Sequence, residues 1–327
     1  MDFTAISAVD WWLLGSAPCS AGSCPAIVAT TDGGASWHGL PAPGSPYGQY
    51  GASASGGVTQ LRFATAERGW AFDPGLYATT DGGQHWEPIN LGGSVDSLEP
   101  GLGRVYAVVD PATYPPACGS TVTNPCPSPR LWASPVTSRA WVPDAATGDI
   151  AGSLAVHGDD VYLQGGSGAS QGQDLLISRN EGESFTASPN VGYGLPCHFS
   201  PVTEQVIWGT CATGMQAGGI ISTDGGRTFR AANLGGQCAN SSQIAGASAT
   251  VAVGICADGQ SVSIERTTDG GNTFVPVQPP PGPTGLWVLA GFTNPSDGYA
   301  FWSASSGGES LWHTTDGGAH WSMVILR

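Results

Sequence analysis

The chain has 327 residues, of which only 11% are charged, and it contains 50 glycines and 25 prolines. This composition favours many short strands joined by turns over long surface helices. All ten cationic residues are arginine and the formal charge is −15, so the sequence argues against nucleic-acid binding, which needs a basic stripe. No apolar run approaches the roughly 20 residues that a membrane-spanning helix requires.

An eight-residue pattern recurs along the chain: Ser/Thr, any residue, Asp, any residue, Gly, any residue, usually Ser/Thr, then Trp/Phe. Intact copies span residues 30–37, 79–86, 222–229, 267–274 and 314–321, a worn copy spans 178–185, and a more eroded one spans 134–141. We call these seven segments the repeated turns. Six of them carry Asp or Asn at the third position: Asp32, Asp81, Asn180, Asp224, Asp269 and Asp316.

The spacing of the repeated turns predicts the architecture. Their third positions, 32, 81, 136, 180, 224, 269 and 316, lie 44 to 55 residues apart. A period of about 40–50 residues built from short strands is typical of a β-propeller with one four-stranded sheet per blade. The sequence therefore predicts an all-β chain that forms a single seven-bladed propeller, with the repeated turn between the third and fourth antiparallel strands of each blade.

Each repeat offers four strands. In the second repeat they are expected at 58–64, 69–72, 76–79 and 85–89, and the second strand recurs as a short apolar run in every repeat, as a sheet covered on both faces needs. No linker divides the chain, and the first repeat starts on its first strand, so an exchange of terminal strands is not evident. The approximate blades are 1–40, 58–89, 94–143, 150–187, 195–231, 238–277 and 285–327.

The repeated turn reverses the chain tightly, and each of its residues serves that purpose. The Asp side chain can accept hydrogen bonds from backbone N–H groups of its own turn. Glycine permits positive φ at little steric cost. The final Trp or Phe begins the fourth strand and can wedge into apolar space beside its blade. The pattern thus indicates architecture and says little about chemistry.

The pattern resembles the Asp-box, or BNR, repeat of sialidases, sortilin-type receptors, xyloglucanases and photosystem II assembly-factor propellers. The segments 68–72 (RGWAF) and 76–83 (LYATTDGG) look most like the WD40/YVTN/BNR-like proteins exported by high-GC actinobacteria. The resemblance covers the whole chain. It implies that the turns lie on the bottom rim, away from a ligand face built from the loops between second and third strands and those between blades.

Eight cysteines, an even number, suggest disulfides and an oxidising compartment. The sequence contains no C-x-x-C pair, so a zinc site is not indicated. We expect an extracellular or cell-envelope protein whose leader is absent from this sequence. Neighbouring strand ends lie within disulfide reach, which predicts Cys197–Cys211 and Cys238–Cys256. Cys19–Cys24 and Cys118–Cys126 would close loops of the first and third blades.

A sialidase needs three converging arginines for the substrate carboxylate, and only Arg62 is expected on an inner strand, so that activity is not expected. Another glycosidase would need two carboxylates about 5–10 Å apart. Carboxylates expected on the ligand face or inner strands carry no motif: Asp73, Asp96, Asp110, Asp144, Asp149, Asp174, Asp258 and Glu309. Of six histidines only His198 is expected near that face, so neither a metal site nor a cofactor is predicted.

The long Gly/Pro-rich loops carry tyrosines, which suit sugar stacking or protein docking because a ring supplies contact area at little ordering cost. The alternative is that these rings pack only on their own loops. The hypothesis is therefore a secreted, monomeric, non-catalytic binding or scaffold propeller for a protein or glycan; the alternative is a glycoside hydrolase-like enzyme. The candidate binding residues are Tyr47, Tyr50, Arg62, Asp96, Tyr114, Asp149, Tyr193 and His198.

Overall fold

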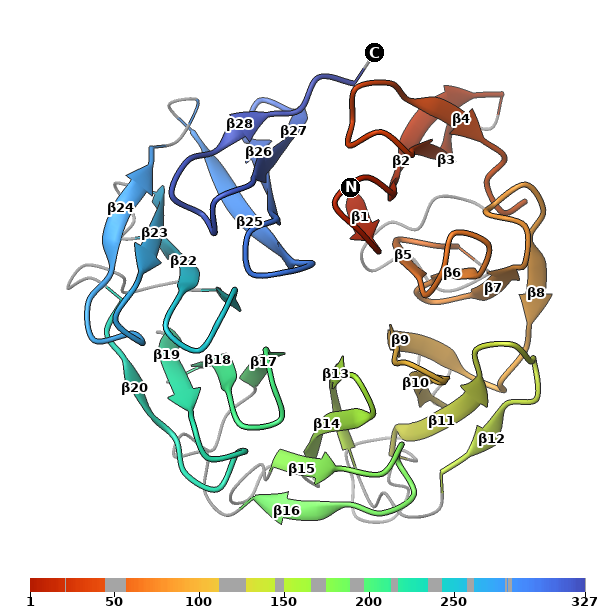
Figure 1. Ribbon diagram of the computed structural model, residues 1–327. Coiled ribbons are helices and arrows are strands. Elements are labelled where there is room, and N and C mark those ends of the chain that lie inside the picture. The colour runs from red at the N-terminus through yellow and green to blue at the C-terminus, as the bar shows by residue number, and fades with distance from the viewer. Residues whose placement is uncertain are drawn as a thin grey trace, which may run out of the picture. The chain divides into compact units, whose positions relative to one another are not determined.

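The computed structural model describes residues 1–20, 22–44, 57–111, 128–144, 150–165, 175–188, 197–212, 217–234, 243–257, 262–279, 281 and 284–326. These residues form seven four-stranded sheets, and each sheet consists of four strands that follow one another in the chain (Figure 1). No helix occurs within the described ranges. The chain is an all-β, seven-bladed β-propeller, as the repeats predict.

The first three sheets have the strand order expected of consecutive hairpins. The first contains β1 (Asp2–Ala5), β2 (Trp11–Cys19), β3 (Gly22–Thr30) and β4 (His38–Leu40). The second contains β5 (Gln60–Phe63), β6 (Gly69–Phe72), β7 (Leu76–Thr79) and β8 (Glu87–Ile89). The third contains β9 (Ser94–Pro100), β10 (Arg104–Asp110), β11 (Arg130–Pro135) and β12 (Val142–Pro143).

The remaining four sheets repeat this order. The fourth contains β13 (Ile150–His157), β14 (Asp160–Gly165), β15 (Leu175–Ser178) and β16 (Thr186–Ser188). The fifth contains β17 (Cys197–Pro201), β18 (Ile207–Ala212), β19 (Ala217–Ser222) and β20 (Arg230–Ala232). The sixth contains β21 (Ile244–Gly246), β22 (Ala252–Ala257), β23 (Val262–Thr267) and β24 (Val275–Gln278). The seventh contains β25 (Gly285–Phe292), β26 (Gly298–Ala304), β27 (Glu309–Thr314) and β28 (Ser322–Met323).

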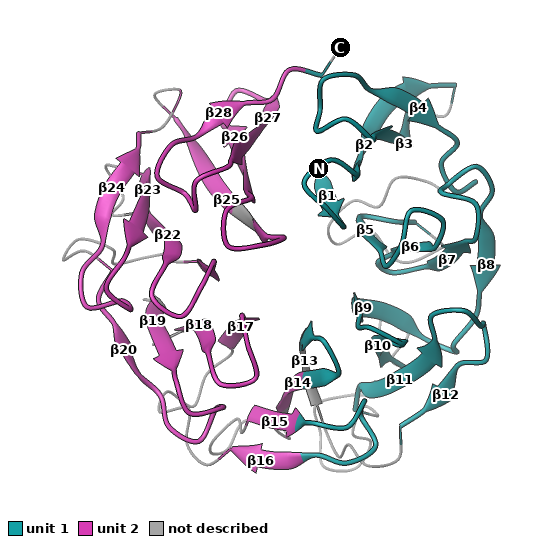
Figure 2. Ribbon diagram, viewed as in Figure 1, with its two compact units in different colours: residues 1–161, 178–185, 326–327 teal, residues 162–177, 186–325 magenta. Residues whose placement is uncertain are grey.

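Contacts divide the chain into two compact units (Figure 2). The first unit comprises residues 1–161, 178–185 and 326–327, and the second comprises residues 162–177 and 186–325. Within the first unit β1 lies against β5, β5 against β9 and β9 against β13; within the second, β21 lies against β17 and β25. In each unit the first strand of one sheet therefore neighbours the first strand of the next.

Apolar side chains between neighbouring sheets form the core of each unit. In the first unit one cluster is centred on Trp70, Leu98 and Val105, and another contains Trp12, where the Trp12 ring stacks on Phe63 at 4.0 Å between centroids. The second unit has a cluster around Trp208 and another around three tryptophans, Trp287, Trp302 and Trp321. The buried apolar runs of the second strands supply much of each cluster, because both faces of a blade are covered.

Each repeated turn lies between the third and fourth strands of its sheet, and the fifth turn shows how it is held. Asp224 Oδ1 accepts hydrogen bonds from the Thr228 amide (2.9 Å) and the Ser222 hydroxyl (2.9 Å), while Oδ2 accepts one from Thr228 Oγ1 (2.6 Å). Ser222 Oγ in turn accepts a bond from the Gly226 amide at 2.8 Å. The Asp and the Ser thus satisfy backbone groups that the strand ladder leaves unpaired.

These hydrogen bonds lower the pKa of the turn aspartates. The pKa of Asp224 falls to about 2, chiefly because the Thr228 hydroxyl donates to the carboxylate. Asp32, Asp81 and Asp269 also have a pKa of about 2, with the side chain four residues later as the main cause. In the second and seventh turns that side chain is a histidine, whose Nδ1 lies 2.6 Å from Asp81 or Asp316 Oδ2.

Glycines supply the backbone conformation that the turn requires. In the fifth turn Gly225 and Gly226 have φ of 76° and 87°, values that an L side chain rarely adopts. The fourth turn is an exception, because Glu181 occupies the equivalent of Gly225 with φ of 57°. The third turn departs further: its third position is Val136, which is 7% exposed and packs into the Trp70 cluster.

Candidate functional site

The two ends of each sheet carry different kinds of segment. The repeated turns and the turns from first to second strand lie at one end, which we call the turn end. The loops from second to third strand, and the segments that enter the first strand, lie at the other, which we call the loop end. In the first unit three described aspartates lie at the loop end of the second and third sheets: Asp73 after β6, Asp96 near the start of β9 and Asp110 at the end of β10.

Asp96 has the most strongly perturbed carboxylate of this group. Its side chain is exposed, yet its pKa is raised to about 6. Crowding by surrounding protein atoms is the main cause, and repulsion from Asp110 and Asp73 adds to it. Three carboxylates therefore concentrate negative charge at this end, and Asp96 holds its proton more tightly than a free aspartate does.

Hydrogen bonds from residues at the start of β5 fix the Asp73 carboxylate. Its Oδ2 accepts bonds from Thr59 Oγ1 (2.5 Å) and Gln60 Nε2 (3.3 Å). Asp73 has φ of 70°, and the following peptide bond to Pro74 is cis. The Pro74 carbonyl then accepts a bond from the Val95 amide at 3.0 Å, which ties the end of the second sheet to the start of the third.

Arg62, on β5, is already held by two carboxylates. Its Nη1 donates to Asp2 Oδ2 at 3.0 Å and its Nε donates to Glu99 Oε1 at 2.9 Å, so β1, β5 and β9 share one ion-pair network. The guanidinium is poorly solvated, which opposes its charge, but the Glu99 and Asp2 carboxylates outweigh that effect and raise its pKa. Arg62 therefore braces three neighbouring first strands, and it is not free to hold a substrate carboxylate. No motif in the sequence indicates its partners Asp2 and Glu99.

The other predicted binding residues are separate from this group or fall outside the described ranges. His198 lies exposed on β17 in the second unit, opposite Thr210 of β18. Tyr47, Tyr50, Tyr114, Asp149 and Tyr193 lie outside the described residues, as do the candidate carboxylates Asp174 and Asp258. Of the predicted set, only Arg62 and Asp96 belong to the neighbouring strands β5 and β9.

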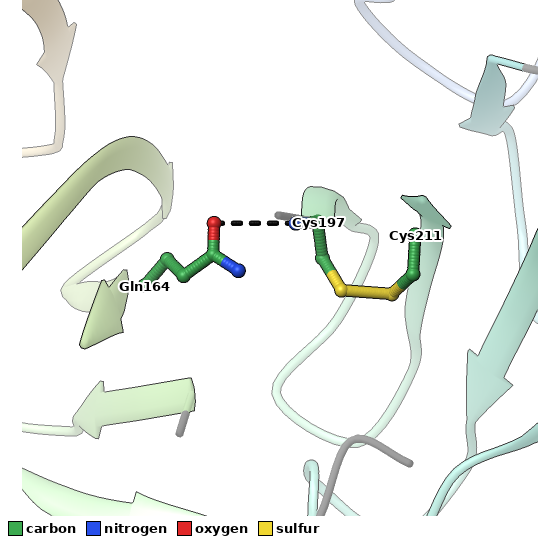
Figure 3. The surroundings of a disulfide bond; sticks show 3 residues. All are labelled: Gln164, Cys197 and Cys211. Carbon is green, nitrogen blue, oxygen red and sulfur yellow. Dashed lines mark hydrogen bonds between the residues drawn. A yellow bond between two sulfur atoms is a disulfide. The ribbon is translucent and has the colours of Figure 1, made fainter. Parts of the chain in front are cut away.

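Two predicted disulfides are confirmed. Cys19–Cys24 joins the ends of β2 and β3, and Cys197–Cys211 links opposed residues of β17 and β18 with Cα atoms 4.0 Å apart. Gln164 Oε1 accepts a hydrogen bond from the Cys197 amide at 3.2 Å, so the second bridge is also tied to β14 (Figure 3). Cys256 is disulfide-bonded, but its predicted partner Cys238 lies outside the described residues. The predicted Cys118–Cys126 pair also lies outside them.

Within the described ranges, no group of three or more His, Cys, Asp or Glu side chains is placed to hold a metal ion. The same ranges contain no helix that is long and apolar enough to cross a membrane.

Solved structures similar to this chain are β-propellers. The propeller domain of the Trilobed protease from Pyrococcus furiosus, described as having an open velcro topology, matches 99% of this chain and 97% of its own with a TM-score of 0.62 and 7% identity. A YCF48 structure bound to a D1 peptide matches 96% of this chain and 92% of its own, with a TM-score of 0.59 and 17% identity. YCF48 from Cyanidioschyzon merolae matches 97% of this chain and 94% of its own, with a TM-score of 0.60 and 16% identity.

At these identities the likeness shows the fold alone. No protein-family model matches the chain, and no curated protein matches it.

Proposed function

We propose that this chain is a non-catalytic binding or scaffold propeller that recognises a segment of a partner protein at its loop end. The observation that carries the proposal is the grouping of Asp73, Asp96 and Asp110. Repulsion from Asp110 and Asp73 adds to the larger effect of burial in raising the pKa of Asp96 to about 6. A cationic segment placed beside these carboxylates would relieve their mutual repulsion, so the site favours a basic partner. The peptide bound by the structurally similar YCF48 supports a protein partner over a glycan.

The finer identity of the chain belongs to the same proposal. The pattern of the repeated turns supports an Asp-box propeller of the exported actinobacterial type. The two disulfides support export to an oxidising compartment, since such bonds rarely persist in the cytosol. We propose that the secreted protein is a monomer.

The whole chain can be tested for this function on an array of immobilised 15-residue peptides, both basic and neutral. A glycan array is probed with the chain in parallel. We expect binding to a subset of basic peptides. The paired substitution Asp96→Asn and Asp110→Asn should weaken that binding about thirtyfold, since it removes two charge contacts of about 1 kcal/mol each. Glu204→Gln, an exposed carboxylate in the second unit, is the matched control and should change binding less than twofold. Equal binding by wild type and the paired variant would overturn the proposal.

One observation favours a second candidate, a glycoside-active enzyme. A carboxyl group with a pKa of about 6 suits a general acid, and Asp110 and Asp73 are close enough to perturb Asp96. Such an enzyme would cleave a member of a panel of chromogenic glycosides, with activity that falls above pH 6 and is lost in Asp96→Asn. A blank panel removes this candidate and leaves the binding function. A sialidase is not expected, because Arg62 is occupied by Asp2 and Glu99.

A further inference from the structure

A cavity of about 280 Å³ lies in the first unit, between the third sheet and the fourth repeated turn. Its wall comprises Arg104, Ala133, Val142, Asp144 and residues 181–183. It is separate from the aspartates of the loop end described above.

The third sheet contributes one face of its strands to this wall. Tyr106 lies opposite Ala133, and Ala133 lies opposite Val142, so these three side chains share a face. Arg104 and Asp144 lie two residues from Tyr106 and Val142, respectively, which places them on the same face. An apolar strip, in which Val142 is 52% exposed, therefore runs between charged groups.

The fourth turn contributes the opposite wall, and it differs from the intact turns at the residues that line the cavity. Glu181 replaces the first glycine and keeps its positive φ, and Glu183 follows Gly182 at a position where the other turns have Ala, Gln, Arg or Asn. A non-glycine residue adopts this left-handed conformation only at a cost in free energy. The fourth turn thus places two carboxylates in the cavity wall that faces the third sheet, and one of them, Glu181, has a strained backbone.

The second glycine of the fourth turn has partly different neighbours from the second glycine of the intact turns. A methyl group placed on this glycine would meet an apolar side chain of the preceding sheet in four intact turns: Leu40 for Gly83, Ile177 for Gly226, Trp208 for Gly271 and Val253 for Gly318. On Gly182 it would meet Tyr106 at 3.2 Å and Asp144 Oδ2 at 3.5 Å. Only carbon atoms adjoin the glycine in those four turns, whereas a carboxylate oxygen lies beside the aromatic ring at Gly182.

The electrostatic environment is negative despite Arg104. Burial raises the pKa of Tyr106 to about 12, against the opposing charge of Arg104. The carboxylates of Glu181, Asp159 and Asp144 act in the same direction as burial, so they lie close enough to be felt at the ring. Asp144, Glu181 and Glu183 outnumber the one arginine of the wall. The guanidinium also has an unused donor, because Arg104 Nε is buried without a hydrogen-bond partner among the described residues.

We propose that this cavity binds the side chain of an arginine or lysine in a partner protein. The aliphatic stem would lie along Ala133 and Val142, and the cationic head would meet the carboxylates of Asp144, Glu181 and Glu183. A backbone carbonyl of the partner would accept from the Arg104 guanidinium. Pockets for drug-sized ligands measure about 300–1,000 Å³, so a cavity of about 280 Å³ suits a single long side chain. This proposal is independent of the loop-end function.

The test is an NMR titration of the whole chain with N-acetyl-arginine amide, with N-acetyl-citrulline amide as the neutral isostere. We expect a saturable shift of the Gly182 amide signal with arginine, and none with citrulline. Glu183→Gln and Glu181→Gly should each weaken binding about fivefold, as loss of one charge-assisted contact of about 1 kcal/mol implies. Glycine is the native residue of the equivalent position in the intact turns, so Glu181→Gly should fold.

Glu67→Gln removes an exposed carboxylate of the same unit that lies outside the cavity, and it should leave the affinity within twofold of wild type. The proposal is overturned if citrulline binds as well as arginine, if Glu67→Gln weakens binding as much as Glu183→Gln, or if no saturable shift occurs at Gly182. Stronger binding of N-acetyl-glutamate amide would also overturn it and would assign the cavity to an anion at Arg104.

Discussion

The fourth and fifth repeated turns share the same backbone hydrogen bonds, but one has charged neighbours and the other has apolar neighbours. In both, the Gly182 or Gly226 amide donates to the hydroxyl of the first residue, at 2.9 and 2.8 Å, and the third residue accepts from the amide four positions later. The fifth turn uses an ionised Asp224 and packs Gly226 on Ile177. The fourth uses neutral Asn180, flanks it with Glu181 and Glu183, and faces Tyr106 and Asp144. The same turn backbone therefore packs against an apolar side chain in the fifth turn and carries two exposed carboxylates in the fourth.

The largest expected effect comes from removing the central acceptor of the fifth turn. Asp224→Ala loses the bonds from the Thr228 amide, Thr228 Oγ1 and the Ser222 hydroxyl. We expect a loss of about 2 kcal/mol in the free energy of unfolding, because hydrogen bonds to charged acceptors contribute more than neutral ones. Urea denaturation measures this loss. Glu204→Ala should change the free energy by less than about 0.5 kcal/mol, as expected of an exposed side chain without special contacts. A neutral result for Asp224→Ala would mean that the carboxylate does not hold the turn.

The next effect isolates the conformational cost of the fourth turn. Glu181→Gly should raise the free energy of unfolding by about 1 kcal/mol, since glycine adopts the positive φ of 57° without a Cβ penalty. The reciprocal Gly225→Glu, at φ of 76°, should lower it by a similar amount. Thermal and urea unfolding of both variants give the comparison. If Glu181→Gly proved destabilising, the glutamate would contribute contacts that outweigh its backbone strain.

How far the sequence predicts this molecule depends on which residues are repeated. The third positions of the turns locate seven sheets, because the spacing of the repeats is regular. The positions of Cys197 and Cys211 at neighbouring strand ends predict their disulfide, because the pairing of consecutive strands is local. The Arg62 network could not be predicted, since Asp2 and Glu99 come from strands of two other sheets and follow no motif. One residue in the sequence points to the cavity, namely the glutamate at the glycine position of the fourth turn. Its meaning depends on Asp144 and Tyr106, which the pattern does not place opposite that turn.

A pH profile distinguishes the two turns by the charge of their third residue. The folded-state pKa of Asp224, about 2, lies below its ordinary value of 3.8, so its stabilisation is present above pH 4 and is lost as the pH falls toward 2. Asp224→Asn should therefore be less stable than wild type at pH 7, by about 1 kcal/mol or less because solvent screens this exposed turn, and should match it near pH 2. Asn180→Ala, in contrast, should lose stability equally at both pH values. Equal pH profiles for Asp224→Asn and wild type would contradict the assignment of acid sensitivity to this carboxylate.

The smallest effect concerns why the fourth turn has asparagine at all. Asn180→Asp would gain charge-assisted bonds from the Ser184 amide and the Ser178 hydroxyl, which already donate to Asn180 Oδ1 at 3.1 and 2.9 Å. It would lose the bond from Asn180 Nδ2 to Ser184 Oγ and place a third negative charge beside Glu181 and Glu183. These contributions oppose one another, so the free energy of unfolding should change by less than about 0.5 kcal/mol.

In the background of Glu181→Gly and Glu183→Gln the repulsion is absent, and Asn180→Asp should then stabilise by about 1 kcal/mol, as a charge-assisted bond does. A double-mutant cycle measures this coupling from four unfolding curves. A coupling near zero would show that the flanking glutamates do not act on the third position. A coupling of the expected sign would mean that the neutral Asn180 is a consequence of the two glutamates, because the turn that presents them to the cavity avoids adding a third like charge.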